Sequence, residues 1–475
     1  MLAGWSETMD SAAAGELDGG TAGGGRYLVC GAKGVGKSTL LRYVTNRLLS
    51  SPASERVAFL DLDCGQPELG PPGMMTLTVL DGPLLSEPPV HMTRRRRRRG
   101  RGGGSGEQEG EEGEGETLVE HAAAHYFGDV SSKSDPDAYV AMAASLAGRY
   151  ESLRLEQQSA GDGDGPSLPL VVNTDGWVKG LGAEVLAAAI SSCDPCVVLQ
   201  INGWTRAKSF DLPADGAAGR AVRLFRSHGG EGAAGCPPPG GASTDDEARP
   251  SSGGPSDGAS SARASASDHR DHRLASYLLG GRGAMSALHP DVAFHREHGL
   301  LDPDDAIGEA LARMRPYAVP LGCVDVYPSP GFLDGAPADE LRRLWGARGD
   351  LLSDDAVESI NGAVVGLCSS GRRGGGGAGG CSAGSGPPVL DCVGLGVVRA
   401  ADVRRGVLYV LTPVRPGLLE GVDALVAGDG VKLPLACVYR GVRSESLAHV
   451  SVGHGATSAG LGADVMRSRN RSRGK

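Results

Sequence analysis

A glycine-rich run near the start of the chain has the spacing needed to hold a phosphate group. Gly31, Gly36, Lys37 and Ser38 fit the pattern G-x-x-x-x-G-K-[ST] at every fixed position. Glycines let backbone N–H groups point inward at phosphate oxygens, a lysine can bridge two phosphates, and a hydroxyl can hold Mg²⁺. The residues predicted to bind the nucleotide are Gly31, Ala32, Lys33, Gly34, Val35, Gly36, Lys37, Ser38 and Thr39.

The sequence around this run supplies the strand and helix that such a loop requires. Residues 27–30 are apolar and predict a short buried strand. After the loop, Leu40, Leu41, Val44 and Leu48 fall on one face of a helix. The plain alternative is a glycine-rich turn that caps a helix, and the complete motif in this context disfavours it.

Two carboxylates follow the next predicted strand, residues 57–62. Side chains alternate along a strand, so we expect Asp61 and Asp63 to project to the same face. In an open α/β sheet the carboxyl ends of the strands border the ligand crevice. One carboxylate there can serve Mg²⁺ and another a substrate hydroxyl. A helix cap or a solvated turn is the alternative, and the position soon after the phosphate loop disfavours it.

The predicted elements alternate in the first part of the chain and become short strands in the second. The first part continues with a helix at 137–156, a strand at 168–172, a helix at 183–190 and a strand at 196–201. This alternation predicts an α/β fold of the P-loop NTPase type, a parallel sheet flanked by helices. The β-type runs that follow are 363–368, 389–398, 406–411 and 432–439. They predict a C-terminal β-rich domain.

Low-complexity segments divide the chain into the predicted domains. The 76 glycines and 29 prolines concentrate in a few runs, which predict disordered insertions because they cannot bury enough apolar surface. The predicted parts are a disordered N-terminus (1–25), a P-loop kinase domain (26–315) with insertions at 93–117 and 227–268, a β-rich domain (316–440) with an insertion at 370–388, and a flexible basic tail (441–475).

The net charge, the hydropathy and the cysteines argue against three kinds of function: coating of nucleic acid, spanning of a membrane and binding of a metal by cysteine. The net charge of −10 argues against a protein that coats nucleic acid by bulk charge. Seven arginines between Arg94 and Arg101 precede an acidic block, so we interpret this run as an insertion that could serve as a nuclear or nucleolar address. No run approaches 18 apolar residues, so no membrane span is expected. The ten scattered cysteines favour reduced thiols over a metal site.

The class of P-loop protein can be narrowed from the same residues. GTPases read guanine with an Asn-Lys-x-Asp loop, and the strand end at Asn173, Thr174, Asp175 and Gly176 lacks the lysine and the spacing. Motor ATPases place their acidic strand later and are larger. A kinase that passes a γ-phosphoryl group to a hydroxyl fits the phosphate loop and the two aspartates better.

Several motifs together resemble the polynucleotide 5′-hydroxyl kinase family, and more narrowly its nucleolar branch, which processes ribosomal RNA. The resemblance rests on residues 31–38, 61–73, 126–137 and 172–182 in the first part, and on 361–368, 394–399 and 408–414 in the second. It implies transfer of the γ-phosphate of ATP to the 5′-hydroxyl of an RNA end, with Mg²⁺. The chain departs from the family pattern where Val130 and Ser132 replace a threonine and a proline.

The resemblance also implies roles for individual residues. Lys37, Asp61 and Asp63 are the predicted catalytic residues, Ser38 and Asp61 the metal ligands, and Asp63 is favoured as the base. The predicted substrate-binding residues are Gln66, Thr174, Trp177 and Arg273. Trp177 would stack on the terminal base, although an aromatic residue alone is more often part of a core. Arg273, with Arg270, is a candidate lid arginine; a solvated helix face is the equal alternative.

The same resemblance predicts the setting in which the protein works. It implies RNA 5′ ends in ribosomal precursor RNA as substrates, an RNA-processing endonuclease or a pre-ribosomal complex as partner, no membrane, and a place in the nucleus and nucleolus. The second hypothesis is an ATP-binding scaffold of an RNA-processing complex that does not turn over. The intact Lys37, Ser38, Asp61 and Asp63 argue against the scaffold, whereas Val130 and Ser132 leave it open.

Overall fold

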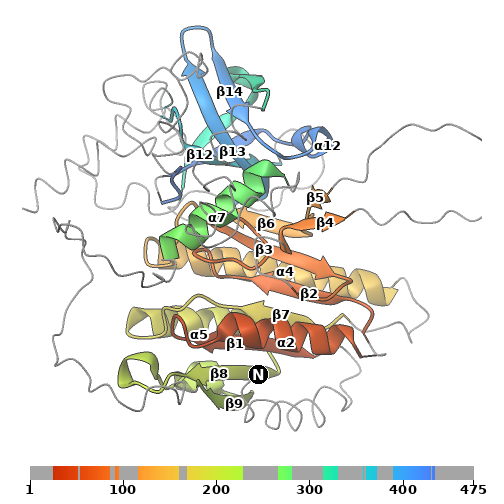
Figure 1. Cartoon of the computed structure of the whole chain (residues 1–475), viewed down its shortest axis with the longest axis vertical. Coiled ribbons are helices and arrows are strands. Elements are labelled where there is room, and N and C mark those ends of the chain that lie inside the picture. The colour runs from red at the N-terminus through yellow and green to blue at the C-terminus, as the bar shows by residue number, and fades with distance from the viewer. Residues whose placement is uncertain are drawn as a thin grey trace, which may run out of the picture.

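The structure, a computed structural model, is built on two large sheets that lie one above the other, with helices around the lower one (Figure 1). It describes residues 25–51, 54–85, 91–95, 116–159, 168–227, 266–280, 314–329, 357, 360–371, 389–428 and 430–433. Most of the segments predicted to be disordered lie outside these residues, and so does the predicted strand at 432–439 apart from its first two residues.

The first sheet has seven strands in the order β6-β3-β2-β7-β1-β8-β9. They are β1 (Arg26–Gly31), β2 (Val57–Asp61), β3 (Met74–Leu80), β6 (Ala123–Tyr126), β7 (Leu170–Asn173), β8 (Val197–Asn202) and β9 (Ala221–Arg226). The five strands from β2 to β9 are parallel, as the alternation of elements predicts. β3 and β6 are antiparallel to their neighbours, so the predicted parallel sheet is mixed at this edge. Residues 62–73 connect β2 to β3 and contain no helix that could serve as a crossover, which favours antiparallel pairing of the two strands.

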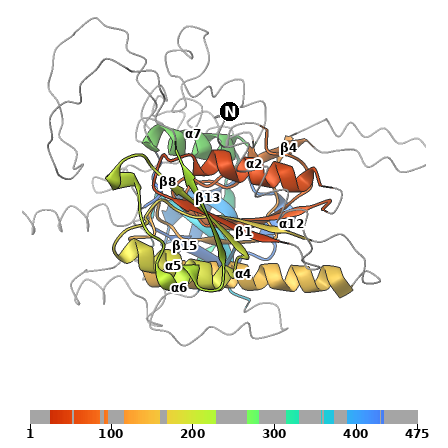
Figure 2. The same ribbon diagram turned by 90° about the horizontal axis from the view of Figure 1, so that it is seen from below.

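Helices cover both faces of this sheet. They are α2 (Lys37–Leu49), α4 (Pro136–Ser159), α5 (Leu181–Cys193), α6 (Ala214–Ala217) and α7 (Ala266–Leu279), with a short 3₁₀ turn, η1 (Arg206–Lys208). α2 and α7 lie on one face, and α4, α5 and α6 lie on the other (Figure 2). Both faces of β1 and β2 are therefore buried, which explains why their sequences are continuous apolar runs and do not alternate.

The second sheet has six strands in the order β10-β14-β13-β12-β15-β11 and confirms the predicted β-rich C-terminal part. The elements are β10 (Tyr317–Pro320), η3 (Leu321–Cys323), β11 (Asp325–Pro328), β12 (Val364–Ser369), β13 (Asp391–Asp402), β14 (Val407–Leu411), α12 (Pro416–Leu419) and β15 (Ala424–Ala427). One hydrophobic cluster joins the two sheets, and it includes Met74 and Tyr126 of the first sheet, Tyr277 of α7 and Leu395 of β13. The predicted domain boundary at residue 315 stays a prediction, and α7, which precedes it in the chain, packs into this shared cluster.

The disorder predicted for the insertion at about 93–117 does not extend to its two ends, and the insertion itself stays a prediction. β4 (Thr93–Arg95) and β5 (Glu116–Leu118) pair as an antiparallel ribbon. Backbone pairing can order such ends even where composition predicts none, because the partner strand supplies the hydrogen bonds. Residues 96–115 lie outside the described residues.

Candidate active site

The phosphate loop connects β1 to the start of α2. Gly34 and Gly36 have φ angles of 74° and 103°, which favour glycine. Gly36 is the N-cap of α2, no side chain caps the helix, and its first turn holds no acidic residue. The N–H groups of this helix end are therefore open to an anion, and the helix dipole favours one there.

Lys37 lies folded back over the loop. Its Nζ donates to the carbonyl oxygen of Gly31 at 2.9 Å, and the side chain is buried. Burial lowers the pKa of Lys37, whereas the nearby carboxylates of Asp63 and Asp175 raise it. Ser38 and Thr39, next along the helix, are exposed and can meet a ligand at the mouth of the loop. The loop therefore fits the phosphates of a nucleotide, and the predicted binding of Mg²⁺ by the Ser38 hydroxyl stays a prediction.

Asp61 is enclosed at the carboxyl end of β2. Its Oδ2 accepts the backbone N–H of Glu68 at 2.5 Å, and its Oδ1 accepts the side-chain amide of Asn173 at 2.8 Å. Burial and the neighbouring charge of Asp63 raise the pKa of Asp61 to about 7. This carboxyl group supports the strand end, and its predicted role as a metal ligand stays a prediction.

Asp63 is partly exposed and anchors the loop that follows β2. Its Oδ1 accepts the backbone N–H groups of Gly65 at 3.1 Å and of Gln66 at 2.9 Å. A Cβ atom on Gly65 would lie 2.5 Å from the carbonyl oxygen of Val130, so this loop packs closely against the segment before α4. Of the two aspartates, Asp63 is therefore the one that a substrate hydroxyl could reach.

A buried ionic network stabilises the loop behind Asp61. The Oε1 atom of Glu68 accepts from the Nε of Arg42 at 2.6 Å and from the Nδ1 of His91 at 2.8 Å. Although burial of Glu68 opposes ionisation, the hydrogen bonds from His91 and Arg42 hold the pKa of Glu68 below its usual value. Glu68 therefore stays ionised while its backbone N–H orients Asp61. The sequence analysis missed this residue because its partners lie far away in the chain.

Arg273, the candidate lid arginine, lies on α7 and is 7% exposed, so the solvated-face alternative is wrong for this residue. Burial lowers its pKa, and the negative charges of Glu68, Asp63 and Asp61 oppose that shift in this order. These interactions place the guanidinium within electrostatic range of the acidic loop after β2. Its Nε is enclosed by protein and has no hydrogen-bond partner among the described residues. Arg270 is partly exposed on the same helix.

The predicted clasp, residues 174–177, touches the phosphate loop. A Cβ atom on Gly176 would lie 2.9 Å from the backbone nitrogen of Lys33. The ring of Trp177 packs against Gly182, where an added Cβ would lie 2.5 Å from the ring, and the ring is partly exposed. Thr174 is turned inward, and its hydroxyl donates to the carbonyl oxygen of Val29 at 2.9 Å. Thr174 thus ties the clasp to β1, and its role in binding substrate stays a prediction.

Asp175 is a second site residue, after Glu68, that sequence reasoning missed. Its carboxylate accepts the hydroxyl of Ser132 and the backbone N–H of Trp177, the latter at 3.0 Å. The surrounding protein and the charge of Asp63 raise its pKa, while the Ser132 bond and Lys37 lower it. The signal that could have found Asp175 is its place directly after a buried strand, beside the strand of the phosphate loop.

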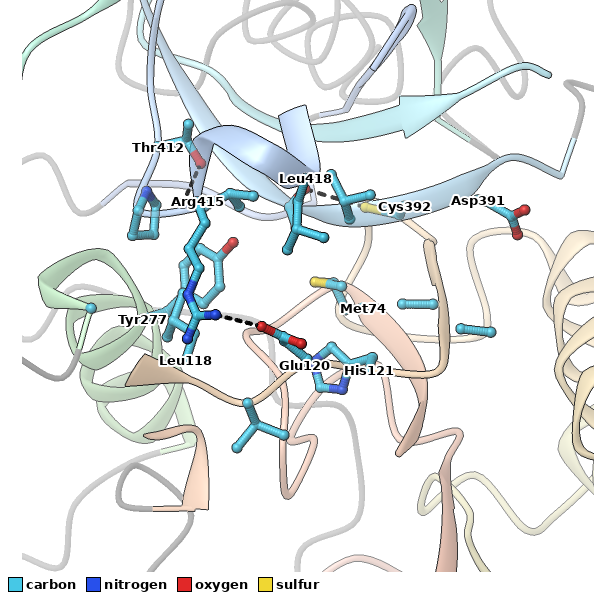
Figure 3. A pocket seen from close by; sticks show the side chains of 18 of the residues that line it. Met74, Leu118, Glu120, His121, Tyr277, Asp391, Cys392, Thr412, Arg415 and Leu418 are labelled. Atoms are coloured by element: carbon cyan, nitrogen blue, oxygen red, sulfur yellow. Dashed lines mark hydrogen bonds and ion pairs between the residues drawn. The ribbon is translucent and has the colours of Figure 1, made fainter. Parts of the chain in front are cut away.

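A second hollow lies away from this site, between the edge strand β6 and the second sheet. It is a cavity of about 1320 Å³, bordered by His121, Tyr277 and Cys392. An ion pair between Glu120 and Arg415, 2.7 Å long, crosses it (Figure 3). The predicted site residues are not among those that border it. Among the described helices, none is long and apolar enough to cross a membrane.

Two family models match separate parts of the chain. The family "mRNA cleavage and polyadenylation factor CLP1 P-loop" matches residues 31–212, and the family "NOL9-like, C-terminal domain" matches residues 336–433. Among solved structures, the Clp1p–Pcf11p complex is 14% identical, with a TM-score of 0.48 over 89% of this chain and 76% of the other.

Curated relatives extend the match along the chain. A polynucleotide 5′-hydroxyl-kinase NOL9 of Arabidopsis thaliana is 29% identical over 86% of this chain and 85% of its own length. The NOL9 protein of Danio rerio is 27% identical over 86% of this chain, but the match spans only 46% of that protein. A polynucleotide 5′-hydroxyl-kinase grc3 of Aspergillus niger is 38% identical over 36% of this chain and 19% of its own length. The chain is therefore similar over most of its length to curated polynucleotide 5′-hydroxyl kinases named NOL9 and grc3, and it contains a CLP1 P-loop region and a NOL9-like C-terminal region.

Proposed function

We propose that the protein transfers the γ-phosphate of ATP to the 5′-hydroxyl of an RNA chain. One observation carries the proposal: Lys37, Asp63 and the clasp at Gly176 converge on the mouth of a single phosphate loop. The names of the relatives, which describe polynucleotide 5′-hydroxyl kinases, support the choice of acceptor. A nucleotide-binding scaffold would not need the partly exposed carboxylate of Asp63 and the buried Arg273 near the loop after β2.

The residues divide the reaction between them. The loop N–H groups and Lys37 hold the phosphates, and Ser38 with an aspartate would hold Mg²⁺, which neutralises phosphate charge when bound. Asp63 accepts the proton of the 5′-hydroxyl, and the hydroxyl oxygen forms a bond to the γ-phosphorus. The bond from that phosphorus to the β–γ bridging oxygen breaks, and ADP leaves with the electron pair. Arg273, close to Asp63, compensates the charge of the transferred group.

The cellular setting is part of the same proposal. The family branch suggests ribosomal precursor RNA as the source of 5′ ends, and a nuclear and nucleolar location. An RNA-processing endonuclease or a pre-ribosomal complex is the partner we infer from it. Affinity purification from nucleolar extracts tests this: recovery of precursor RNA and a nuclease supports the inference, and their absence contradicts it.

A transfer assay tests the activity itself. ATP labelled at the γ-phosphate should label RNA and DNA oligonucleotides that carry a 5′-hydroxyl, and should not label oligonucleotides with a 5′-phosphate. Lys37→Ala should lower kcat/KM by at least about a hundredfold, since it removes the cation at the transferred phosphates. Lys432→Ala, at an exposed lysine of the C-terminal part, is the matched control. Phosphate transfer that persists in Lys37→Ala would contradict the proposed kinase function.

A further inference from the structure

Two cysteines face each other across the middle of the second sheet. Cys368 of β12 pairs directly with Cys392 of β13, and the two strands are antiparallel. Residues directly opposite in such strands have Cα atoms about 4.5–5.5 Å apart, and their side chains project from the same face of the sheet. A disulfide bond spans Cα separations of about 4.4–6.8 Å. The backbone is therefore placed for a bond between the two sulfur atoms.

A bulge in β13 creates this pairing. Leu367 of β12 pairs with Gly394 of β13. A regular ladder would then place Val393 opposite Cys368, and Cys392 would project from the other face of the sheet. The register shifts between Leu367 and Cys368, so that Cys392 takes the opposite position. Gly394, next to the bulge, has a φ angle of 152°, which favours glycine. Bulges re-aim side chains in this way, and here the bulge brings two thiols together.

The two thiols are buried and already interact. A hydrogen bond joins the side chains of Cys368 and Cys392. The Sγ of Cys392 also donates to the carbonyl oxygen of Gly394 at 3.3 Å. The hydrogen bond with Cys392, together with burial, raises the pKa of the Cys368 thiol well above its usual value, so Cys368 keeps its proton at neutral pH. Both cysteines are free thiols in the structure.

A small molecule can reach one of the two sulfur atoms from the cavity between β6 and the second sheet. Cys392 borders this cavity, whereas Cys368 is 1% exposed and is not among the residues that line it (Figure 3). The side chains of Glu120 and Arg415, whose ion pair crosses the cavity, are 60% and 51% exposed, so the cavity opens to solvent. Its volume of about 1320 Å³ admits many molecules the size of water.

We propose that Cys368 and Cys392 form a redox site, in which hydrogen peroxide converts the two thiols into a disulfide that joins β12 to β13. The sulfur of Cys392 attacks one peroxide oxygen, the O–O bond breaks, and the other oxygen leaves as water with the thiol proton. The product is a sulfenic acid at Cys392. The sulfur of Cys368 then attacks the sulfur of Cys392, the S–O bond breaks, and a second water leaves with the Cys368 proton. Two electrons pass from the thiols to the peroxide, and a dithiol reductant reverses the reaction.

The bond would stabilise the boundary between the two sheets. It closes a loop made of the chain between Cys368 and Cys392, and closing a loop lowers the entropy of the unfolded chain. Both cysteines belong to the hydrophobic cluster that also contains Met74 and Tyr126 of the first sheet. The inference goes beyond the proposed kinase function and does not depend on it, because neither thiol is among the predicted site residues.

The test uses the whole protein. It is treated with hydrogen peroxide, the peroxide is removed with catalase, and the remaining thiols are alkylated as the protein unfolds. Peptide mass analysis should find a link between Cys368 and Cys392 that dithiothreitol removes. Hydrogen exchange in β12 and β13 should slow by at least about tenfold in the linked protein. Cys323→Ser, at a half-buried thiol of η3, is the matched control and should form the same link.

Two variants separate the roles of the thiols. Cys392→Ala should abolish both the link and the slower exchange. Cys368→Ala should stop the reaction at the sulfenic acid of Cys392, which dimedone labels. If either variant fails to fold, the mass analysis of the wild-type protein still decides. A link from Cys392 to Cys381, oxidation at neither cysteine of the pair, or unchanged exchange in the linked protein would overturn the proposal.

Discussion

At the scale of single residues, Asp61 makes the stability of the folded protein depend on pH. Its pKa is raised from 3.8 to about 7 by burial. The native state therefore keeps a proton that the unfolded state loses between these two values. Stability contributed by the protonated form is present at low pH and is lost as the pH rises toward 7. The difference between the two pKa values lowers the free energy of unfolding by about 4 kcal/mol over this pH range, at ~1.4 kcal/mol for each pH unit.

Asp61→Asn should remove this pH dependence. Relative to wild type, its free energy of unfolding should rise by about 3 kcal/mol between pH 5 and pH 8 in metal-free buffer, because an amide does not ionise. One of the two hydrogen bonds that Asp61 accepts, from Glu68 or from Asn173, becomes a contact between two donors in this variant, and that cost is the same at both pH values. Urea denaturation at both pH values measures the change. Asp137→Asn, at an exposed carboxylate, is the control, and the same slope in wild type and Asp61→Asn contradicts the argument.

At the scale of elements, the clasp depends on a close backbone approach. A Cβ on Gly176 would meet the backbone of Lys33 at 2.9 Å, and backbone atoms cannot move away cheaply. Gly176→Ala should therefore push the clasp off the phosphate loop and lower kcat/KM by about a hundredfold, the effect of a displacement of about 1 Å. Steady-state transfer assays measure it. Gly148→Ala in α4, where nothing lies within 4 Å of an added Cβ, is the control and should keep wild-type activity.

The elements that could be predicted are those whose buried faces show as a pattern of apolar residues in the sequence. The apolar runs of β1 and β2 and the helical face of α2 agree with the structure, because both faces of the strands and one face of the helix are covered. The direction of β3 could not be predicted, because strand direction depends on the connection and is not encoded in local pattern. The Ser132–Asp175 bond could not be predicted either, since it joins residues 43 positions apart.

At the scale of the whole molecule, the two sheets share a tightly packed boundary. Tyr126 of β6 is almost completely buried, and Gly366 of β12 lies against it, so that an added Cβ would be 2.6 Å from the Cβ of Tyr126. The same ring approaches Gly73, near Val431 of the C-terminal part. Such packing leaves no room for another methyl group, because interiors are close to crystal density.

Gly366→Ala should therefore destabilise both sheets together, by about 1–3 kcal/mol, as overpacked cores do. Guanidinium denaturation measures the free energy of unfolding, and hydrogen exchange reports β6 and β12 separately. Gly322→Ala in η3, with nothing within 4 Å of the added Cβ, should leave stability nearly unchanged. Faster exchange in β12 alone would mean that the sheets unfold independently. Faster exchange in both strands would mean that the second sheet stabilises the edge strand β6. The chain continues from β6 through Val130 and Ser132 to the acceptor site.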